Sequence, residues 1–208
     1  MTIYTLSHGS LKLDVSDQGG VIEGFWRDTT PLLRPGKKSG VATDASCFPL
    51  VPFANRVSGN RFVWQGREYQ LQPNVEWDAH YLHGDGWLGE WQCVSHSDDS
   101  LCLVYEHRSG VYHYRVSQAF HLTADTLTVT LSVTNQGAET LPSPIKGQRR
   151  CHLVPAGILI FRCRRKRGFR HRRAVTGWSG SSGWRVSFAS SYRRNWILTS
   201  PRRCRASG

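Results

Sequence analysis

The stretch TLTVTLSVTNQG, Thr126 to Gly137, sets the fold class of this chain. Apolar residues stand at every second position from Leu127 to Val133, and Thr or Ser fills the positions between them. This period of two is typical of a β-strand that buries one face and exposes the other. The turn-forming run Asn135-Gln136-Gly137 then ends the strand.

Other segments of the first 143 residues show the same pattern. Apolar and polar residues alternate over 11–15 and again over 112–122. The segment 61–71 is typical of a hairpin with Gly66 in its turn. No stretch has a convincing helical period. Many short strands separated by polar turns predict an all-β fold, an antiparallel β-sandwich.

Charge divides the chain into two unlike parts. Residues 1–143 hold 10 Lys and Arg against 15 Asp and Glu, whereas residues 144–208 hold 17 Lys and Arg and no acidic residue, which together give the net charge of +12. From about Ser143 the periodicity also vanishes, and only Leu153–Phe161 looks able to pack as a short strand. We therefore expect a β-sandwich domain over 1–142 and a basic tail over 143–208 that is disordered.

Cysteine spacing and hydropathy bear on compartment and membrane. The six cysteines form no CxxC pair, so the usual spacing of a zinc site is missing and buried free thiols in a reducing compartment are the favoured interpretation. The N-terminal MTIYTLSHGS has neither the basic start nor the apolar core of a signal peptide. Leu153–Phe161, the longest apolar run, is too short to span a bilayer. We expect a cytoplasmic protein with no membrane partner and no metal.

The first polar segment between the strands is CFPLVPFANRV, Cys47 to Val57. Its two prolines each remove a ladder donor, so we expect a proline-stiffened apolar loop that delivers Asn55 and Arg56. An amide beside a rigid donor fork suits a ligand rich in hydroxyl groups or a carboxylate. On pattern alone, a surface Asn and Arg that tie down a turn remain the simpler alternative.

The second polar segment is HYLHGDGWLGEW, His80 to Trp91. Its three glycines allow tight turns, Trp87 and Trp91 offer flat apolar faces for the C–H surface of a sugar, and His83 can donate or accept near neutral pH. Core tryptophans and a hydrogen-bonded loop histidine are the alternative. His80 and His83 have the spacing of a metal pair but lack an evident third ligand.

Taken together, FPLVPFANRVSGNRFVWQGREYQL and the following LHGDGWLGEWQ resemble the aldose 1-epimerase (galactose mutarotase) family. The resemblance extends through TLTVTLSVTNQGAETLP and so covers about residues 1–142. It implies a β-sandwich isomerase of carbohydrate metabolism that binds a free hexose, such as galactose or glucose, and interconverts its α and β anomers without a cofactor. The sugar-contacting Arg of the family falls on Arg56 and its first-cleft His on His83; Asn55 is carried over as the neighbour of Arg56 in the motif, and the region of Trp87 is expected to form the wall of the cleft.

The resemblance stops where the catalytic groups should follow. In the family a His in a Trp-His-Pro-Tyr-Phe-like motif is the acid and a Glu near the C-terminus is the base. This chain has neither that motif nor any Glu beyond Glu139, so no catalytic residue is identified and we expect little activity.

Codon arithmetic offers a reason for the loss. Ala156–Phe161 can be encoded so that a frame shifted by two bases reads Trp-His-Pro-Tyr-Phe, and Ala174–Trp184 at the same offset gives an acidic, foldable sequence. The sequence thus suggests a truncated family domain with an out-of-frame tail.

Two alternative functions remain at this stage. One is a carbohydrate-binding remnant without catalysis. The other is nucleic-acid binding through the Arg-rich tail, with Trp178, Trp184 and Trp196 stacking on bases. Because no recognised motif frames the tail, we expect such binding to be non-specific.

Overall fold

The computed structural model describes residues 1–45 and 47–139 in full, and the backbone of residues 141–142, 158–161, 177–179, 185–193 and 196–197. These residues form mostly antiparallel β-strands. The helical turns among them are the short 3-10 helices η1 (Ala42–Asp44) and η2 (Ser58–Asn60). The predicted antiparallel β-sandwich is confirmed.

The first sheet is built mainly from the N-terminal strands. Its spatial order is β1 (Ile3–His8), β2 (Leu11–Ser16), β3 (Ile22–Arg27), β5 (Cys47–Leu50) and β15 (Ile158–Phe161), with β4 (Thr30–Pro31) paired to β3. All these pairs are antiparallel. The alternation expected over 11–15 therefore lies in β2.

The second sheet contains the longest strands. Its order is β10 (Gln92–His96), β11 (Ser100–His107), β12 (Tyr114–Leu122), β13 (Thr126–Asn135), β17 (Arg185–Arg193) and β16 (Gly177–Ser179). The stretch that alternates in the sequence is β13, and its apolar positions from Leu127 to Val133 are all buried. The pairing of β13 with β17 is parallel, whereas the others are antiparallel.

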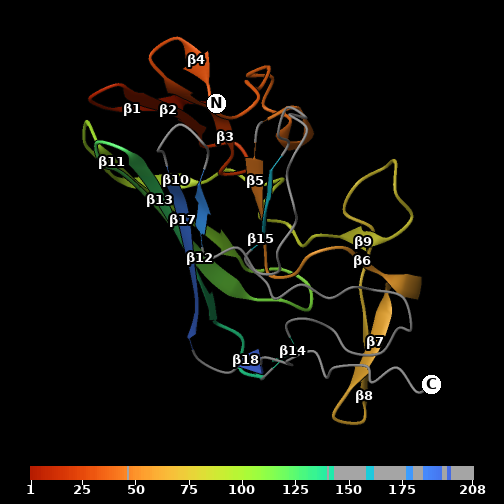
Figure 1. The fold of residues 1–208 in the computed structure, drawn as a ribbon. Helices are drawn as coiled ribbons and strands as arrows, with labels where there is room; N and C mark the ends of the chain where they lie inside the picture. Colours follow the sequence, from red (N-terminus) through yellow and green to blue (C-terminus); the bar gives the residue numbers. More distant parts are fainter. Residues whose placement is uncertain are drawn as a thin grey trace, which may run out of the picture.

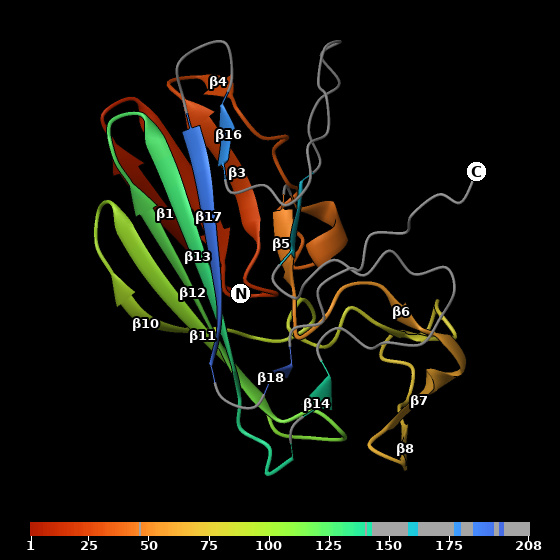
Figure 2. The same ribbon diagram turned by 60° about the horizontal axis from the view of Figure 1, so that its bottom comes forward.

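The two sheets face each other across one apolar core, and Figure 2 shows them as two layers. Leu13 and Phe25 from the first sheet belong to the same buried cluster as Phe120 and Leu131 from the second. The main-chain N–H of Ser7 also donates to the Asp98 carbonyl, which ties the layers at one end. Burial alternates with a period of two along β12 and β13, whereas β2, β3 and β5 of the first sheet are buried at most of their positions.

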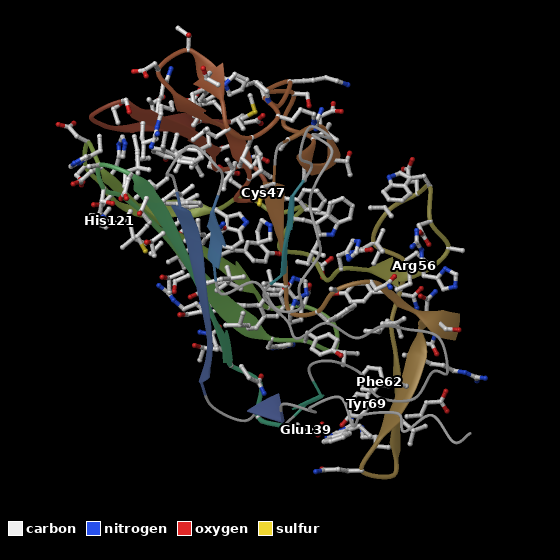
Figure 3. The ribbon with its side chains drawn as sticks, viewed as in Figure 1. Cys47, Arg56, Phe62, Tyr69, His121 and Glu139 are labelled. Carbon is white, nitrogen blue, oxygen red and sulfur yellow. The ribbon has the colours of Figure 1, made fainter. Side chains whose placement is uncertain are left out.

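The predicted hairpin is confirmed and lies to one side of the sandwich (Figure 1). It consists of β7 (Arg61–Trp64) and β8 (Arg67–Gln70), with Gly66 at a φ of 79° in the turn. Phe62 stacks on Tyr69 with ring centroids 5.1 Å apart. The Tyr69 hydroxyl donates to Glu139, just after β13, and so links the hairpin to the second sheet (Figure 3).

The expectation of a loop over the whole proline-rich segment is wrong for its first part, because Cys47–Leu50 forms β5. β5 pairs with β3 at Cys47, so Pro49 removes no donor from that pair, and on its other side Pro49 stands opposite Leu159 of β15. The loop begins after Leu50.

The division at residue 142 and the predicted disorder of 143–208 fall largely outside the described residues and stay predictions. The structure gives the backbone of β15 inside the Leu153–Phe161 run and of β16 and β17 beyond it. It also gives a two-residue pair between β14 (Leu141–Pro142) and β18 (Trp196–Ile197).

Candidate functional site

The candidate site lies where the two polar segments meet beside the sandwich. Strands β6 (Arg56–Val57) and β9 (Tyr81–Leu82) pair antiparallel and place Asn55 next to His83. The Asn55 N–H donates to His83 Nδ1 at 2.7 Å, and the His83 N–H donates to the Asn55 carbonyl at 3.0 Å. This pairing brings Asn55, Arg56 and His83 together, Trp87 lies against His83, and Figure 3 shows Arg56 where β6 and β9 meet.

The backbone of this junction is unusual. Asn55 and His83 both adopt positive φ, at 81° and 62°. Gly84 follows with a φ of 68°, and a Cβ placed on it would lie 2.1 Å from the Val51 carbonyl oxygen. Only glycine combines this backbone conformation with so close an approach. Gly84 therefore lets the two polar segments touch.

The imidazole of His83 is neutral near pH 7 and acts as a hydrogen-bond donor. Burial lowers the pKa of its imidazole to about 4, and the charge of Arg56 lowers it further against the opposing effect of Asp78. Because Nδ1 accepts the Asn55 N–H, the neutral ring carries its proton on Nε2. At pH 7 the site therefore offers a single ring N–H at this position.

Arg56 is oriented by an acid that sequence analysis did not select. Its Nε donates to Asp78 Oδ2 at 2.6 Å, and an Nη2 contact of 2.5 Å reaches the same oxygen. The His80 N–H binds the other carboxylate oxygen at 3.0 Å. Hydrogen bonding to Arg56 lowers the pKa of Asp78 to about 2, so the carboxylate stays charged. The Arg56 side chain remains 48% exposed, which leaves part of its donor fork open to solvent.

The predicted aromatic wall is arranged differently from the expectation. Trp87 is only 4% exposed, and its Nε1–H donates to the carbonyl oxygens of Leu82 and Gly84. Its ring meets the ring of His83 edge-on at a centroid distance of 6.0 Å. The aromatic ring at the surface is Trp77, which is 66% exposed and lies 6.3 Å from Trp87.

Asn74 holds the second polar segment in place. Its side-chain amide donates to the carbonyls of Leu82 and Gly84 at 2.9 and 2.8 Å, and its Oδ1 accepts the Leu82 N–H at 2.9 Å. Asn74, Trp77 and Asp78 all belong to the stretch before β9, which has no strand period to mark it. The only sequence signal was a tryptophan in a polar stretch, where no sheet face exists to bury it.

An open depression of about 450 Å³ runs along this same stretch. It is lined by Pro73, Asn74, Val75, Glu76, Asp78 and Ala79. Its volume lies within the range of about 300–1,000 Å³ that is usual for small-molecule sites. The depression shares Asp78 with the Arg56 pair.

The described residues contain no cluster of three His, Cys, Asp or Glu able to hold a metal ion. His80 Nδ1 faces Asp78 at 3.1 Å and His83 Nδ1 accepts from Asn55, so the two rings of the suspected metal pair serve different partners. In the part of the chain that the structure describes, no helix is both long and apolar enough to cross a membrane.

The β-sandwich of this chain is similar to the fold of solved galactose mutarotase-like proteins. A galactose mutarotase related enzyme from Lactobacillus acidophilus matches at a TM-score of 0.54 and 17% identity, over 67% of this chain and 45% of that one. A galactose mutarotase-like protein from Clostridium acetobutylicum matches at 0.54 and 18%, over 65% and 46%. One from Lactobacillus casei matches at 0.54 and 15%, over 66% and 46%. The chain thus spans less than half the length of these structures.

The family follows from the sequence match. The family model of aldose 1-epimerase matches residues 2–144, which is more than half of the chain. The chain belongs to the aldose 1-epimerase family.

Proposed function

We propose that this chain binds a free hexose, such as galactose or glucose, at the junction of Asn55, Arg56 and His83. The proposal rests on two donors close to each other. One is the Arg56 guanidinium, which Asp78 fixes, and the other is the neutral His83 imidazole, which keeps its proton on Nε2. Both groups are hydrogen-bond donors, and both lie where the two polar loops meet. The chain belongs to a family whose substrates are sugars.

Each group suits one part of a hexose. The exposed part of the Arg56 fork can donate to neighbouring hydroxyl oxygens, and the His83 Nε2–H to a third. Trp77 offers a flat apolar surface to the C–H face of the ring. The Asn55 N–H donates to His83 Nδ1, so Asn55 sets the position of the imidazole.

Interconversion of anomers needs two further groups. A base must remove the C1 hydroxyl proton and an acid must protonate the ring oxygen, after which the ring opens, rotates about C1–C2 and closes on the other face of the carbonyl. The family's acid and base are expected in a Trp-His-Pro-Tyr-Phe-like motif and a late Glu, and this sequence carries neither. Positioned proton transfer contributes about 10²–10⁴-fold to such a step. We propose that the chain is an isomerase by family that retains binding and little turnover.

We also propose that the tail is an out-of-frame reading of the missing part of the family domain. The family match ends at residue 144, and no acidic residue follows it. The hidden Trp-His-Pro-Tyr-Phe over Ala156–Phe161 supports the same idea. The nucleotide sequence across codons 140–160 tests it, and the idea is abandoned if no family-like sequence stands in the alternative frame.

Binding and turnover are tested on the full chain with galactose. Saturation-transfer NMR should detect galactose, and Arg56→Ala should weaken its binding about tenfold through the loss of charged hydrogen bonds. Arg61→Ala is the matched control, because Arg61 is also exposed and its ion pair among the described residues is with Glu68 on the hairpin. Wild-type chain that binds no galactose would refute the binding proposal.

Polarimetry with freshly dissolved α-galactose measures the turnover. The expected rate is close to that of buffer alone. A rate far above buffer would show that other residues of this chain supply the acid and the base.

The remaining partner assignments follow the same reasoning. We propose no sequence-specific nucleic acid and no membrane as partner, and a cytoplasmic location. Free thiols at Cys47, Cys93 and Cys102 support a reducing compartment.

A further inference from the structure

The carboxylate of Asp85 lies at the centre of a polar cluster beneath the candidate site. Its Oδ2 accepts a hydrogen bond from the Tyr81 hydroxyl and lies 3.4 Å from His107 Nε2. Its Oδ1 lies 3.3 Å from the amide nitrogen of Asn74. The side chains of Asp85 and His107 are only 19% and 14% exposed, so these contacts are largely shielded from water.

The backbone of Asp85 joins the same cluster. Its N–H points to the Tyr114 hydroxyl at 3.4 Å, and that hydroxyl donates to the Val51 carbonyl at 3.2 Å. Its carbonyl accepts the N–H groups of Leu88 and Gly89 at 3.0 and 3.1 Å. Asp85 thereby connects the turn after His83 to β12, to β9 and to the loop after β5.

His107 and its neighbours extend the cluster into the second sheet. His107 stacks on Tyr114, its cross-strand partner, at a centroid distance of 5.2 Å. The Tyr105 hydroxyl lies 3.3 Å from His107 Nδ1, while His107 Nε2 lies 3.4 Å from Asp85 Oδ2 and 3.4 Å from the Ser109 hydroxyl. Burial, and secondarily the charge of Asp85, raises the pKa of Tyr105 to about 12, which keeps its hydroxyl protonated.

These contacts matter because the site depends on the turn that Asp85 secures. His83 and Gly84 both hold a positive φ, a conformation that costs a non-glycine residue energy unless neighbours impose it. Asp85 follows Gly84, and six separate groups contact its side chain and its N–H and carbonyl groups. The contacts of Asp85 thus offset the conformational cost of the positive φ at His83, two residues earlier.

We infer that Asp85 is a positioning residue, whose carboxylate, held by Tyr81 and His107, fixes the turn that sets His83 against Asn55. Asp85 acts through His83 and contacts no sugar itself. Its consequence for sugar affinity rests on the proposed function, whereas its effect on His83 does not.

The test follows the ring of His83 by NMR in Asp85→Asn, made in the full 208-residue chain, with His83→Gln to assign the resonance. The pKa of His83 should rise from about 4 toward the ordinary 6.5 as the loosened turn admits water. Loss of a negative charge at Asp85 would by itself lower that pKa. A rise therefore reports repositioning, while Arg56 and Asp78, the charges that face the ring, stay unchanged.

Asp125→Asn is the matched control, since Asp125 is exposed in the turn between β12 and β13. It should leave the His83 titration as in the wild type. A folded Asp85→Asn protein in which His83 still titrates near 4 overturns the inference. If Asp85→Asn does not fold, Tyr81→Phe removes only one donor to the same carboxylate. An unchanged His83 pKa in that variant likewise overturns the inference.

The sugar measurement separates this inference from the proposed function. Asp85→Asn should weaken galactose binding about tenfold in the saturation-transfer assay. If the wild-type chain binds no galactose, the proposed function fails, and the titration still decides the role of Asp85.

Discussion

In the sandwich, strands are held by apolar side chains that alternate into one core; around His83, loops are held by a few polar side chains. Phe120 on β12 is 1% exposed and belongs to the main core cluster. By contrast, Asn74, Asp78 and Asp85 hold the loops through hydrogen bonds to Leu82, Arg56 and Tyr81. Burial is spread over many residues, whereas the site depends on single contacts. We therefore expect that single substitutions can disrupt the candidate site while the sandwich stays folded.

The largest effect is expected in the core. Phe120→Ala should lower the free energy of unfolding by about 3–5 kcal/mol, because it removes buried contacts and leaves a cavity. Urea denaturation followed by circular dichroism measures the change. Val94→Ala on β10 is the control, since Val94 is 62% exposed and its loss should cost about 0.5 kcal/mol or less. Equal costs for the two variants would mean that the sandwich is not packed as described.

A smaller effect is expected at Asn74. Asn74→Ala should cost about 1–3 kcal/mol, because the Leu82 N–H loses its partner in a half-buried place and the Leu82 and Gly84 carbonyls keep only the Trp87 donor. Hydrogen exchange should speed up at Leu82 and leave β13 protected. Gln72→Ala, two residues earlier and exposed, is the control and should change neither quantity. Faster exchange in β13 as well would show that loop and sandwich open together.

The same contrast explains how much the sequence could predict. The strand β13 and the hairpin of β7 and β8 follow from local period and a glycine turn, because burial of every second residue is written in neighbouring positions. Cys47–Leu50 was missed as a strand, since the two prolines argue against a central strand and nothing local shows that β5 meets β3 at one residue only.

Residues of the candidate site could be proposed from the sequence where a motif marked them. Asn55, Arg56 and His83 were found by family resemblance, and the structure places them together. Asp78 was missed because its partner Arg56 stands 22 residues away, a distance that no periodicity reports. Trp87 was selected for its flat face, but it is buried and its indole N–H donates to two backbone carbonyls. The exposed tryptophan beside it is Trp77. Such choices depend on which backbone groups lack partners after folding.

The smallest expected effect is a dependence of the free energy of unfolding on pH, which arises from His83 in the loops and not from the core. His83 has a pKa of about 4 in the folded chain against 6.5 when exposed, so the unfolded chain binds its proton more readily between these values. The stabilisation is complete above pH 6.5 and is lost as the pH falls toward 4. We expect a loss of about 1 kcal/mol or less between pH 7 and 5.5, because the ring is partly exposed.

Urea midpoints of the wild type and of His83→Gln at several pH values isolate this contribution. Glu23 acts in the opposite direction, because burial raises its pKa and favours the folded state at lower pH. Its effect is common to both proteins and cancels in the difference. Between pH 7 and 5.5 the wild type should therefore lose more stability than His83→Gln. Parallel curves would mean that the imidazole is open to water, and the loops around His83 would then not form the closed junction with Asn55 on which the candidate site depends.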